Sequence, residues 1–413
     1  MLKTNHKLIG AALLVSVFFY SCSQDQKPTE METTFSVNDS NFDSQNIEGQ
    51  YIVVFNKNMI EDVNSKYPEN YNKAQEAMTN QTRKVLADAS INSVEIINVY
   101  SKTLSGATVK LNKAQVENLK GKKEIAYIEQ DRIVVFSPPC GTPNGGPCGE
   151  PDPGTGGTQE TPYGILRVNG VSNYTGTNVA WIVDTGIDLT HPDLNVDASR
   201  GFNAFTKGRD AGSPNDGNGH GTHVSGTIAA KNNSIGVIGV APGATVIPVK
   251  VLDSRGSGSY SGVIAGVEFV GAHGKSGDVA NLSLGGPVSQ ALDDAILAAS
   301  SFGIKFALAA GNESSDANNS SPARVNGPNI VTISAMDLND KWAYFSNFGN
   351  PPVDYAAPGL AIKSTWKDGG YNTISGTSMA SPHAAGVLLL GTAKSDGYVT
   401  SDPDGNPDPI IVH

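Results

Sequence analysis

Three short segments of the chain hold an acid, an imidazole and a hydroxyl where each could act on a bound molecule. Asp184 ends the apolar run NVAWIVD and is followed by a Gly-containing turn. His220 stands between two glycines in NGHGTHVSG, and Ser378 precedes a long apolar helical stretch in SGTSMASPHAAGVLLL. A base that removes the proton of a hydroxyl, itself oriented by an acid, makes a nucleophile strong enough for acyl transfer.

Two of these segments also have simpler interpretations. Asp184 could only cap its turn, and DTG also occurs in aspartic proteases, but those need a second such Asp and the chain has no other DTG or DSG. His220 and His223 could bind zinc, yet HGTH lacks the Glu of HExxH and no third ligand lies nearby. The glycines beside His220 favour an exposed imidazole that a substrate can approach.

A fourth segment, FALAAGNES, ends an apolar run at Asn312. A side-chain amide there can donate a hydrogen bond to an oxygen that becomes negatively charged during a reaction. The backbone N–H of Ser378 would be a second donor, because the first N–H groups of a helix carry the positive end of its dipole. Together the two donors would form an oxyanion hole.

The order Asp184, His220, Ser378 is the chain order of subtilisin. Residues 158–413 resemble the subtilisin family of serine proteases (subtilases), with features of its proteinase K and bacterial subtilisin branches, through DTGID, GHGTHVSGT and SGTSMASPH. Residues 50–136 are similar to the inhibitory propeptide of that family. The resemblance implies a secreted serine endopeptidase that hydrolyses peptide bonds of proteins through an acyl-enzyme and is made as a self-processed zymogen.

The resemblance also implies where a peptide substrate binds. GSGSY and SLGG would pair with the substrate backbone as β-strands, although each could be an ordinary Gly-rich surface loop. Glu313 falls on the rim of the pocket for the residue before the scissile bond, so we expect tolerance of Lys or Arg there beside large apolar residues. The predicted substrate-binding residues are Gly256, Ser257, Gly258, Ser283, Leu284, Gly285, Ala310, Gly311 and Glu313.

A structural calcium site of bacterial subtilisins has counterparts in this sequence. It uses a Gln near the mature N-terminus, an Asp after the first catalytic segment, and a loop with an Asn and several carbonyls, and such oxygen ligands suit Ca²⁺. The alternative is a plain surface loop with one Asp. The predicted ligands are Gln159, Asp193, Lys231 through its carbonyl, Asn233, Ile235 and Val237. No cofactor is expected for catalysis.

The N-terminus has the composition of an export signal. Lys3 and Lys7 precede a 13-residue apolar run that is too short to span a bilayer, so we expect a signal peptide over 1–21 and an exported protein. Cys22 follows directly and resembles the lipidated cysteine of bacterial lipoproteins, with plain signal cleavage as the alternative. The protein would be secreted, or would be a cell-surface or outer-membrane lipoprotein of a bacterium.

The remaining chain divides by composition into four parts. We expect a polar tether over 22–45, an inhibitory and chaperone propeptide over 46–137, a linker over 138–157 and the peptidase domain over 158–413. In the linker, Cys140 and Cys148 would form a local disulfide in an oxidising compartment, or would remain free thiols. Matching Gln159 puts the mature N-terminus near Thr158, although an earlier cleavage point fits the sequence as well.

The elements that must position these residues follow from hydrophobic periodicity. Residues 50–136 alternate as β-α-β-β-α-β, which is a small ferredoxin-like α+β unit. In 158–413, β-branched runs alternate with Ala- and Gly-rich helical stretches, which predicts a three-layer α/β fold with a parallel sheet and helices on both faces. The last 20 residues are rich in Pro and Asp without a helical period, so we expect an extended segment there in place of closing helices.

Charge and composition exclude several partners. The chain has 413 residues and a net charge of −11. Residues 46–137 carry 12 basic and 11 acidic side chains, and residues 138–413 carry 14 basic and 24 acidic side chains. The acidic balance of the second part argues against nucleic acid, and three cysteines are too few for a disulfide scaffold. We expect a monomer that meets a membrane only through a lipid anchor, with protein substrates and its own propeptide as partners.

Two other classes of function compete with the protease interpretation. One is a surface-binding lipoprotein that kept the fold and lost activity. The other is a protein whose output is inhibition of another protease by residues 50–136. The complete set of Asp184, His220, Ser378 and Asn312 favours an active protease, because a decayed homologue is expected to have lost at least one of them.

Overall fold

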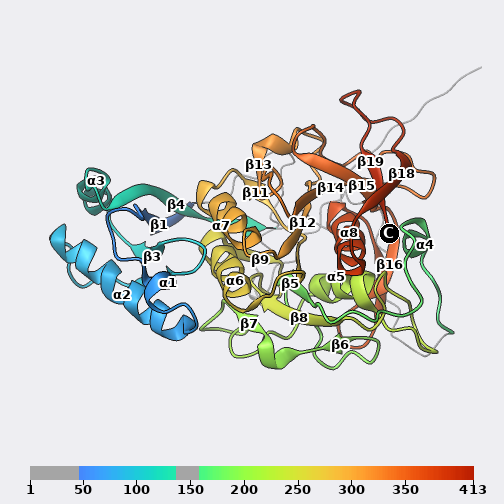
Figure 1. The fold of residues 1–413 in the computed structure, drawn as a ribbon, viewed down its shortest axis with the longest axis horizontal. Helices are drawn as coiled ribbons and strands as arrows, with labels where there is room; N and C mark the ends of the chain where they lie inside the picture. The colour runs from blue at the N-terminus through green and yellow to red at the C-terminus, as the bar shows by residue number, and fades with distance from the viewer. Residues whose placement is uncertain (1–45, 136–157) are drawn as a thin grey trace, which may run out of the picture. The chain divides into compact units, whose positions relative to one another are not determined.

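The computed structural model describes residues 46–135 and 158–413, which belong to one compact unit, Phe42–His413 (Figure 1). We call 46–135 the small module and 158–413 the large region. Within the described residues, no helix is long and apolar enough to cross a membrane.

The small module is an antiparallel four-stranded sheet with helices on one face. The strands have the order β2-β3-β1-β4, and every neighbouring pair is antiparallel, which confirms the predicted split βαβ arrangement. A short helix, α1, was not predicted; its N-cap Asp62 accepts hydrogen bonds from the N–H groups of Asn64 and Ser65. The elements are β1 (Asn46–Phe55), α1 (Val63–Lys66), α2 (Tyr71–Asp88), β2 (Ile96–Tyr100), β3 (Gly106–Lys110), α3 (Lys113–Lys120) and β4 (Ile125–Val135).

Strand β1 buries side chains on both of its faces. Val53 and Phe55 pack into the core of the small module beneath α2 and α3. Ile52 and Val54 alternate with them and belong to a core cluster made mainly by the large region. Because successive side chains of a strand point to opposite faces, one strand joins the two cores.

The large region is built on a ten-stranded sheet. Its strand order is β18-β19-β15-β14-β12-β10-β5-β8-β6, with β7 also paired to β8, and the pairs from β15 to β6 are parallel. The strands are β5 (Ala180–Asp184), β6 (Asn195–Val196), β7 (Phe202–Asn203), β8 (Thr245–Lys250), β10 (Val279–Leu282), β12 (Lys305–Ala309), β14 (Ile330–Met336), β15 (Val353–Pro358), β18 (Lys394–Tyr398) and β19 (Pro409–Val412).

Helices cover both faces of this sheet, as predicted (Figure 1). Trp181 and Val183 of β5 pack against α6 and α7, whereas Ala180 and Ile182 pack against α5 and α8. The helices are α4 (Tyr163–Arg167), α5 (His220–Ala229), α6 (Tyr260–His273), α7 (Gln290–Ser300) and α8 (Thr377–Leu390). Shorter strands outside the large sheet are β9 (Ser257–Ser259), β11 (Gly286–Pro287), β13 (Ser320–Ser321), β16 (Ile362–Thr365) and β17 (Tyr371–Ile374).

The end of the chain is extended, as the sequence predicts. Strands β18 and β19 form an antiparallel pair, and β19 adds to the large sheet through a parallel contact between Ile410 and Ala356 of β15. Ile410, Ile411 and Val412 are buried. The tail therefore extends the sheet at the edge formed by β15.

Candidate active site

The predicted acid and base form a hydrogen-bonded pair. Asp184 is the last residue of β5, and His220 is the first residue of α5. The Nδ1 of His220 lies 2.8 Å from Oδ1 and 3.0 Å from Oδ2 of Asp184. A carboxylate in this position holds the proton of the neutral imidazole on Nδ1 and leaves Nε2 as the basic nitrogen.

Two glycines allow α5 to begin against β5. Gly219 has a φ of 117°, and a Cβ there would collide with the ring of Trp366. A Cβ on Gly221 would collide with the carbonyl oxygen of Gly186. The expectation that these glycines expose the imidazole is wrong, since His220 is only 2% exposed: they let neighbouring groups pack closely around it.

The charges near His220 favour its protonated form. Burial lowers the pKa of His220, but the charge and hydrogen bond of Asp184 and the charge of Asp216 outweigh it, and the pKa lies above the ordinary value of 6.5. His223 differs: its Nε2 lies 2.9 Å from the carbonyl oxygen of Ile362, and burial lowers its pKa to about 3. The two imidazoles have different partners and do not form the histidine pair of a zinc site.

Ser378 lies at the beginning of α8, after the N-cap Gly376. Its Oγ donates a hydrogen bond to the carbonyl oxygen of Ser283 over 3.1 Å. In return, Ser283 Oγ donates to the carbonyl oxygen of Ser378 over 2.8 Å and accepts from Asn281 Nδ2 over 2.8 Å. The end of β10 thus holds the backbone of the serine in place.

The amide of Asn312 has a defined orientation. Its Oδ1 accepts from the N–H of Thr377 over 2.8 Å and from the hydroxyl of Thr377 over 2.9 Å. Because both contacts use the oxygen, Nδ2 is the end of the amide that can donate. Thr377 directly precedes Ser378, so the two proposed oxyanion donors are held next to each other.

A buried asparagine organises the loop that carries Asn312. Asn347 Nδ2 donates to the carbonyl oxygen of Ala310 over 3.0 Å and to Glu313 Oε2 over 2.7 Å. Its Oδ1 accepts from the N–H groups of Glu313 and Ser315, each over 3.0 Å. One side chain from the segment between β14 and β15 therefore fixes both ends of this loop.

A cavity of about 560 Å³ opens beside Ser378. Its lining combines the predicted catalytic residues Ser378 and Asn312 with six predicted substrate-binding residues. These six are Ser257, Leu284, Gly285, Ala310, Gly311 and Glu313. Of the other predicted residues, Gly258 lies on β9, Gly256 lies in the turn before β9, and Ser283 contacts the backbone of Ser378.

The last strand of the small module forms part of the wall of this cavity. Ile133, Val134 and Val135 line it. They pair antiparallel with β9, with Val134 opposite Gly258 and Val135 opposite Ser257. The segment therefore binds by adding a strand to a sheet edge, a mode in which main-chain hydrogen bonds supply the affinity.

Glu268 joins the small module to α6, away from the cavity. Its Oε1 accepts from the N–H groups of Ser101 and Lys102, each over 2.6 Å, and its Oε2 accepts from the N–H of Thr103 over 2.7 Å. The Thr103 hydroxyl and the Gln75 amide add further bonds. Glu268 is only 1% exposed, so these donors replace the water that this carboxylate loses.

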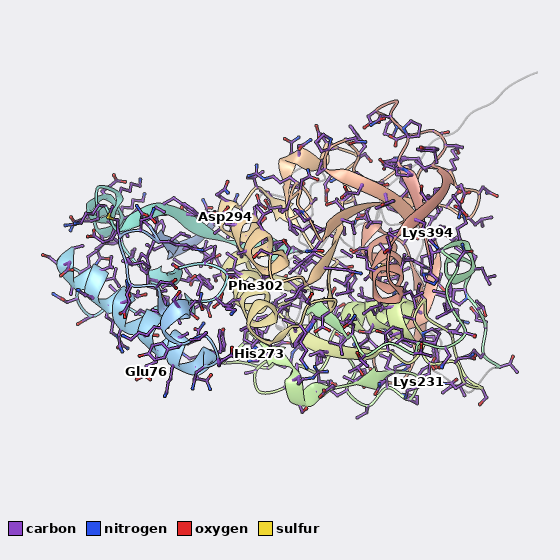
Figure 2. All side chains as sticks on the ribbon, in the orientation of Figure 1. Glu76, Lys231, His273, Asp294, Phe302 and Lys394 are labelled. Carbon is purple, nitrogen blue, oxygen red and sulfur yellow. The ribbon has the colours of Figure 1, made fainter. Side chains whose placement is uncertain are left out.

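Two acids of β4 contact the first turns of α6 and α7. Asp131 Oδ1 accepts from the N–H of Ser261 over 3.1 Å, and Glu129 Oε2 accepts from the N–H of Ala291 over 3.2 Å. Carboxylates are favourable at helix N-termini, where N–H groups are unpaired. Nearby, the hydroxyl of Tyr127 donates to Asp294, which is labelled in Figure 2.

The predicted calcium ligands converge on one another. Gln159 Nε2 lies 2.7 Å from the carbonyl oxygen of Lys231, 3.4 Å from Asn233 Oδ1 and 3.3 Å from the carbonyl oxygen of Val237. Asp193 accepts from Asn233 Nδ2 over 2.7 Å and from the N–H of Val237 over 3.2 Å. Three oxygens thus surround a single donor.

The same loop buries a carboxylate. Burial raises the pKa of Asp193, against hydrogen bonds from Asn233, Val237 and Tyr371, and a bound cation would offset that cost. The N–H of Ile235 donates to Asn233 Oδ1 over 2.8 Å, which shapes the loop. No three His, Cys, Asp or Glu side chains of the described ranges gather as a metal site, so a cation here would depend on one carboxylate and neutral oxygens.

Some predictions fall on residues that the structure does not describe. They are the signal peptide over 1–21, the lipidated Cys22, the tether, the linker and the Cys140–Cys148 disulfide.

An Asp–His pair with a serine at a helix N-terminus and an amide donor beside it defines a serine hydrolase site. Comparison with known proteins specifies the class further. The subtilase family (peptidase S8) matches residues 175–402, and the peptidase inhibitor I9 family matches residues 50–137. The chain belongs to the subtilase family of serine-type endopeptidases, and it carries an I9 inhibitor propeptide.

Relatives agree with this assignment. The chain is 37% identical over 354 residues to alkaline serine exoprotease A of Vibrio alginolyticus, covering 83% of this chain but only 60% of that protein's length. It is 38% identical over 354 residues to an extracellular serine proteinase of a Thermus strain, and the match covers 83% of this chain and 80% of that protein's length. A crystal structure of a cold-adapted subtilisin-like serine proteinase matches at 37% identity and a TM-score of 0.53, covering 60% of this chain and 97% of that one.

Several residues that support the site or hold the propeptide had no place in the sequence predictions. Asn347 and Glu268 act on partners that are 34 and 167 residues away in the chain, so no local pattern could reveal them. Asp216 has a local signal, since an acid shortly before a helix often caps its first turn.

Proposed function

We propose that the chain is an exported zymogen that cleaves itself and then acts as a serine endopeptidase through Asp184, His220, Ser378 and Asn312. One observation supports the proposal above all others: the cavity that Ser378 and Asn312 line is also lined by the last described residues of the propeptide, Ile133–Val135, which pair with β9 as a strand. A peptide chain bound as a strand beside a serine is the arrangement that peptide hydrolysis requires.

The reaction begins at the serine hydroxyl. Ser378 Oγ turns from the carbonyl of Ser283 and attacks the substrate carbonyl carbon, while His220 Nε2 takes its proton. The tetrahedral intermediate collapses, the C–N bond breaks, and the same proton passes to the leaving amine. Water then attacks the acyl-enzyme by the same route and restores Ser378. Asp184 keeps the imidazole in the productive tautomer and stabilises its charged form.

The oxyanion is stabilised by two donors held in advance. Asn312 Nδ2 and the N–H of Ser378 would donate to the negative oxygen of each tetrahedral intermediate. Thr377 supports this role for Asn312, because it binds the amide oxygen. A donor already in place needs no reorganisation when charge develops, which is the source of the rate gain.

The substrate would bind through its main chain, as Ile133–Val135 do on β9. Side-chain preference would then come from the cavity beside Ser378. Its lining is mostly small or apolar, and its charged residues are Glu313 and Arg255, of which Arg255 is paired with Asp253. We therefore infer that large apolar residues and also Lys or Arg are accepted before the scissile bond. Equal cleavage after Arg and after Glu in a peptide pool would contradict this preference.

Maturation would remove most of the chain before residue 158. We infer a signal peptide over 1–21, a tether over 22–45, a propeptide over 46–137, a linker over 138–157 and a mature peptidase over 158–413. Lipidation of Cys22 and a Cys140–Cys148 disulfide belong to the same proposal. Mass spectrometry of the purified precursor would detect an acyl group on Cys22 and a disulfide bond between Cys140 and Cys148.

Calcium would stabilise the mature enzyme at the loop around Asp193. Gln159, Asp193, Asn233 and the carbonyls of Lys231, Ile235 and Val237 would hold the ion, once the amide of Gln159 turns its oxygen inward. The cation would neutralise the buried carboxylate of Asp193. We expect a chelator to lower the melting temperature of the wild type and to have little effect on Asp193→Asn; an unchanged wild-type melting temperature would contradict the site.

Expression of the wild type beside Ser378→Ala tests the function as a whole. The wild type should process itself and cleave a diverse peptide pool, whereas Ser378→Ala should remain a precursor and cleave nothing. Ser375→Ala, three residues earlier, is the matched control and should behave as the wild type. Self-processing in both proteins, or in neither together with no peptide cleavage, would contradict the proposal.

A further inference from the structure

Asp216 lies four residues before His220 and is only 3% exposed. Its Oδ1 accepts from the N–H groups of Asn218 and Gly219 over 2.8 and 2.9 Å. Its Oδ2 accepts from the N–H of Thr222 over 3.0 Å and from the Thr222 hydroxyl over 2.6 Å. The N-cap residue Gly219 has no side chain, so Asp216 supplies the cap at the start of α5.

The same carboxylate also contacts the residue after the catalytic acid. The Thr185 hydroxyl donates to Asp216 Oδ1 over 2.9 Å and accepts from the N–H of Gly221 over 2.9 Å. The N–H of Thr185 donates to Asp184 Oδ1 over 2.7 Å. A continuous set of hydrogen bonds therefore links Asp184, on β5, to both sides of His220, on α5.

We propose that Asp216 is a positioning residue for peptide hydrolysis: it fixes the start of α5 against Thr185, and it adds a second negative charge that stabilises the imidazolium of His220. The inference rests on the proposed function of this site and assigns part of the catalytic power to a carboxylate that touches no substrate. Five donors replace the water that Asp216 loses on burial, so its charge can be kept inside the protein.

The surroundings of His220 favour this electrostatic role. The carboxylates of Asp184 and Asp216 both raise the pKa of His220. Other titratable groups on the elements packed against α5 are bound elsewhere. Lys250 on β8 donates to the carbonyl oxygens of Thr185 and Leu252 and pairs with Asp210. Lys363 on β16 pairs with Glu160. The imidazole of His383 on α8 bonds to the carbonyl oxygen of Met379, and the imidazole of His223 on α5 bonds to the carbonyl oxygen of Ile362.

Asp216→Asn tests the proposal, with Asp278→Asn as the matched control. Asp278 is also 3% exposed and accepts from the N–H groups of Val179 and Lys275 and from Trp181 Nε1, but it lies away from His220. Each precursor is matured by tagged wild-type enzyme that is then removed, and kcat and KM are measured against pH. Melting temperatures show whether each variant is folded.

We expect Asp216→Asn to lower kcat by about tenfold or more with KM within about twofold. The acid limb of its kcat/KM profile should move to lower pH by about 0.5 to 1 unit, because the imidazolium loses a nearby negative charge. Asp278→Asn should lower the melting temperature and leave kcat and the acid limb at wild-type values. Wild-type kcat and acid limb in Asp216→Asn, or equal changes in both variants, would overturn the proposal.

Thr185→Val keeps the test decisive if Asp216→Asn fails to fold. The substitution preserves shape and the charge of Asp216 but removes the hydroxyl that links Asp216 to Gly221. We expect kcat to fall by about threefold to tenfold with the acid limb unmoved. Wild-type kcat in Thr185→Val would refute the positioning role. A wild type that fails to cleave peptides would instead refute the proposed function, so the two failures are distinguishable.

Discussion

The propeptide binds the peptidase in two regions by different means. In the cleft, Ile133–Val135 pair with β9 through the main chain, and any extended peptide can make such contacts. On the helical face, Glu268 accepts hydrogen bonds from the loop 101–103 and from Gln75. The strand pairing in the cleft therefore depends little on side chains, whereas the contacts on the helical face depend on particular residues of this propeptide.

This difference separates catalysis from inhibition. Changes in the cleft should alter turnover and leave propeptide affinity nearly intact, because β4 keeps its other contacts. Changes on the helical face should weaken the propeptide and leave turnover of short peptides intact.

The largest effect is expected from Asn312→Ala in the cleft. Loss of one oxyanion donor should lower kcat by about 10²–10³-fold with little change in KM, because the bond forms in the transition state. Steady-state kinetics on a peptide substrate would measure it. Asn195→Ala, at the exposed first residue of β6, is the control. A fall in kcat below about tenfold, or a weakened propeptide, would contradict the account.

On the helical face, Glu268→Gln should weaken the propeptide by about 10- to 100-fold, because charge-assisted bonds to backbone N–H groups are lost. The inhibition constant of the cleaved propeptide against the mature enzyme would measure it. Asp294→Asn keeps an oxygen that can accept from Tyr127 and removes only the charge, so it should cost about threefold. Equal effects of the two variants, or a change in peptide turnover, would break the separation.

The pH dependence of the wild type gives a test that involves only the cleft. Hydrolysis needs neutral His220, and the charges of Asp184 and Asp216 raise its pKa above 6.5 despite burial. As pH falls, kcat/KM should therefore reach half its maximum above pH 6.5. The same midpoint is expected for Glu268→Gln. A midpoint at or below 6.5 would show that burial dominates.

The smallest effect is expected in the tail, outside both regions. Burial raises the pKa of Asp408 to about 7, against a hydrogen bond from Ser334 and with help from the charges of Asp402, Asp404 and Asp354. A raised pKa stabilises the fold while the group is protonated, and that stability is lost as pH rises through about 7. Asp408→Asn should therefore melt a few degrees above the wild type at pH 8 and level with it at pH 4.

Thermal melts at several pH values would check this last prediction. Asp368→Asn, at an exposed carboxylate, is the control for a general change in net charge. If the melting temperatures of Asp408→Asn and the wild type differ by the same amount at both pH values, the raised pKa of Asp408 is contradicted. Peptide turnover should be the same in both proteins.

The sequence predicted the residues that lie inside continuous motifs. Asp184, His220 and Ser378 each end or begin an element whose hydrophobic pattern is clear, and the parallel sheet brings such ends together. The extended tail followed from the same reasoning, because its Pro and Asp residues exclude a helix. The β-α-β-β-α-β order of the small module was equally accessible.

What the sequence did not reveal depends on contacts between distant segments. Nothing in the pattern of β4 indicates that it pairs with β9, since main-chain pairing leaves no mark on side-chain types. Glu268 sits in the apolar helix α6 and would be judged an unfavourable buried charge until the loop 101–103 supplies its donors. Asn347 looks like an ordinary loop residue until its partners in the Asn312 loop are known.

In the proposed reaction, Ser378 becomes acylated with the help of His220. The most direct measurement mixes mature enzyme with an activated ester peptide and quantifies the initial burst, with mass spectrometry of the quenched protein. We expect a burst of about one acyl group per enzyme, located on Ser378 and lost in both Ser378→Ala and His220→Ala. Turnover without an acyl group on Ser378, or an unchanged burst in His220→Ala, would contradict it.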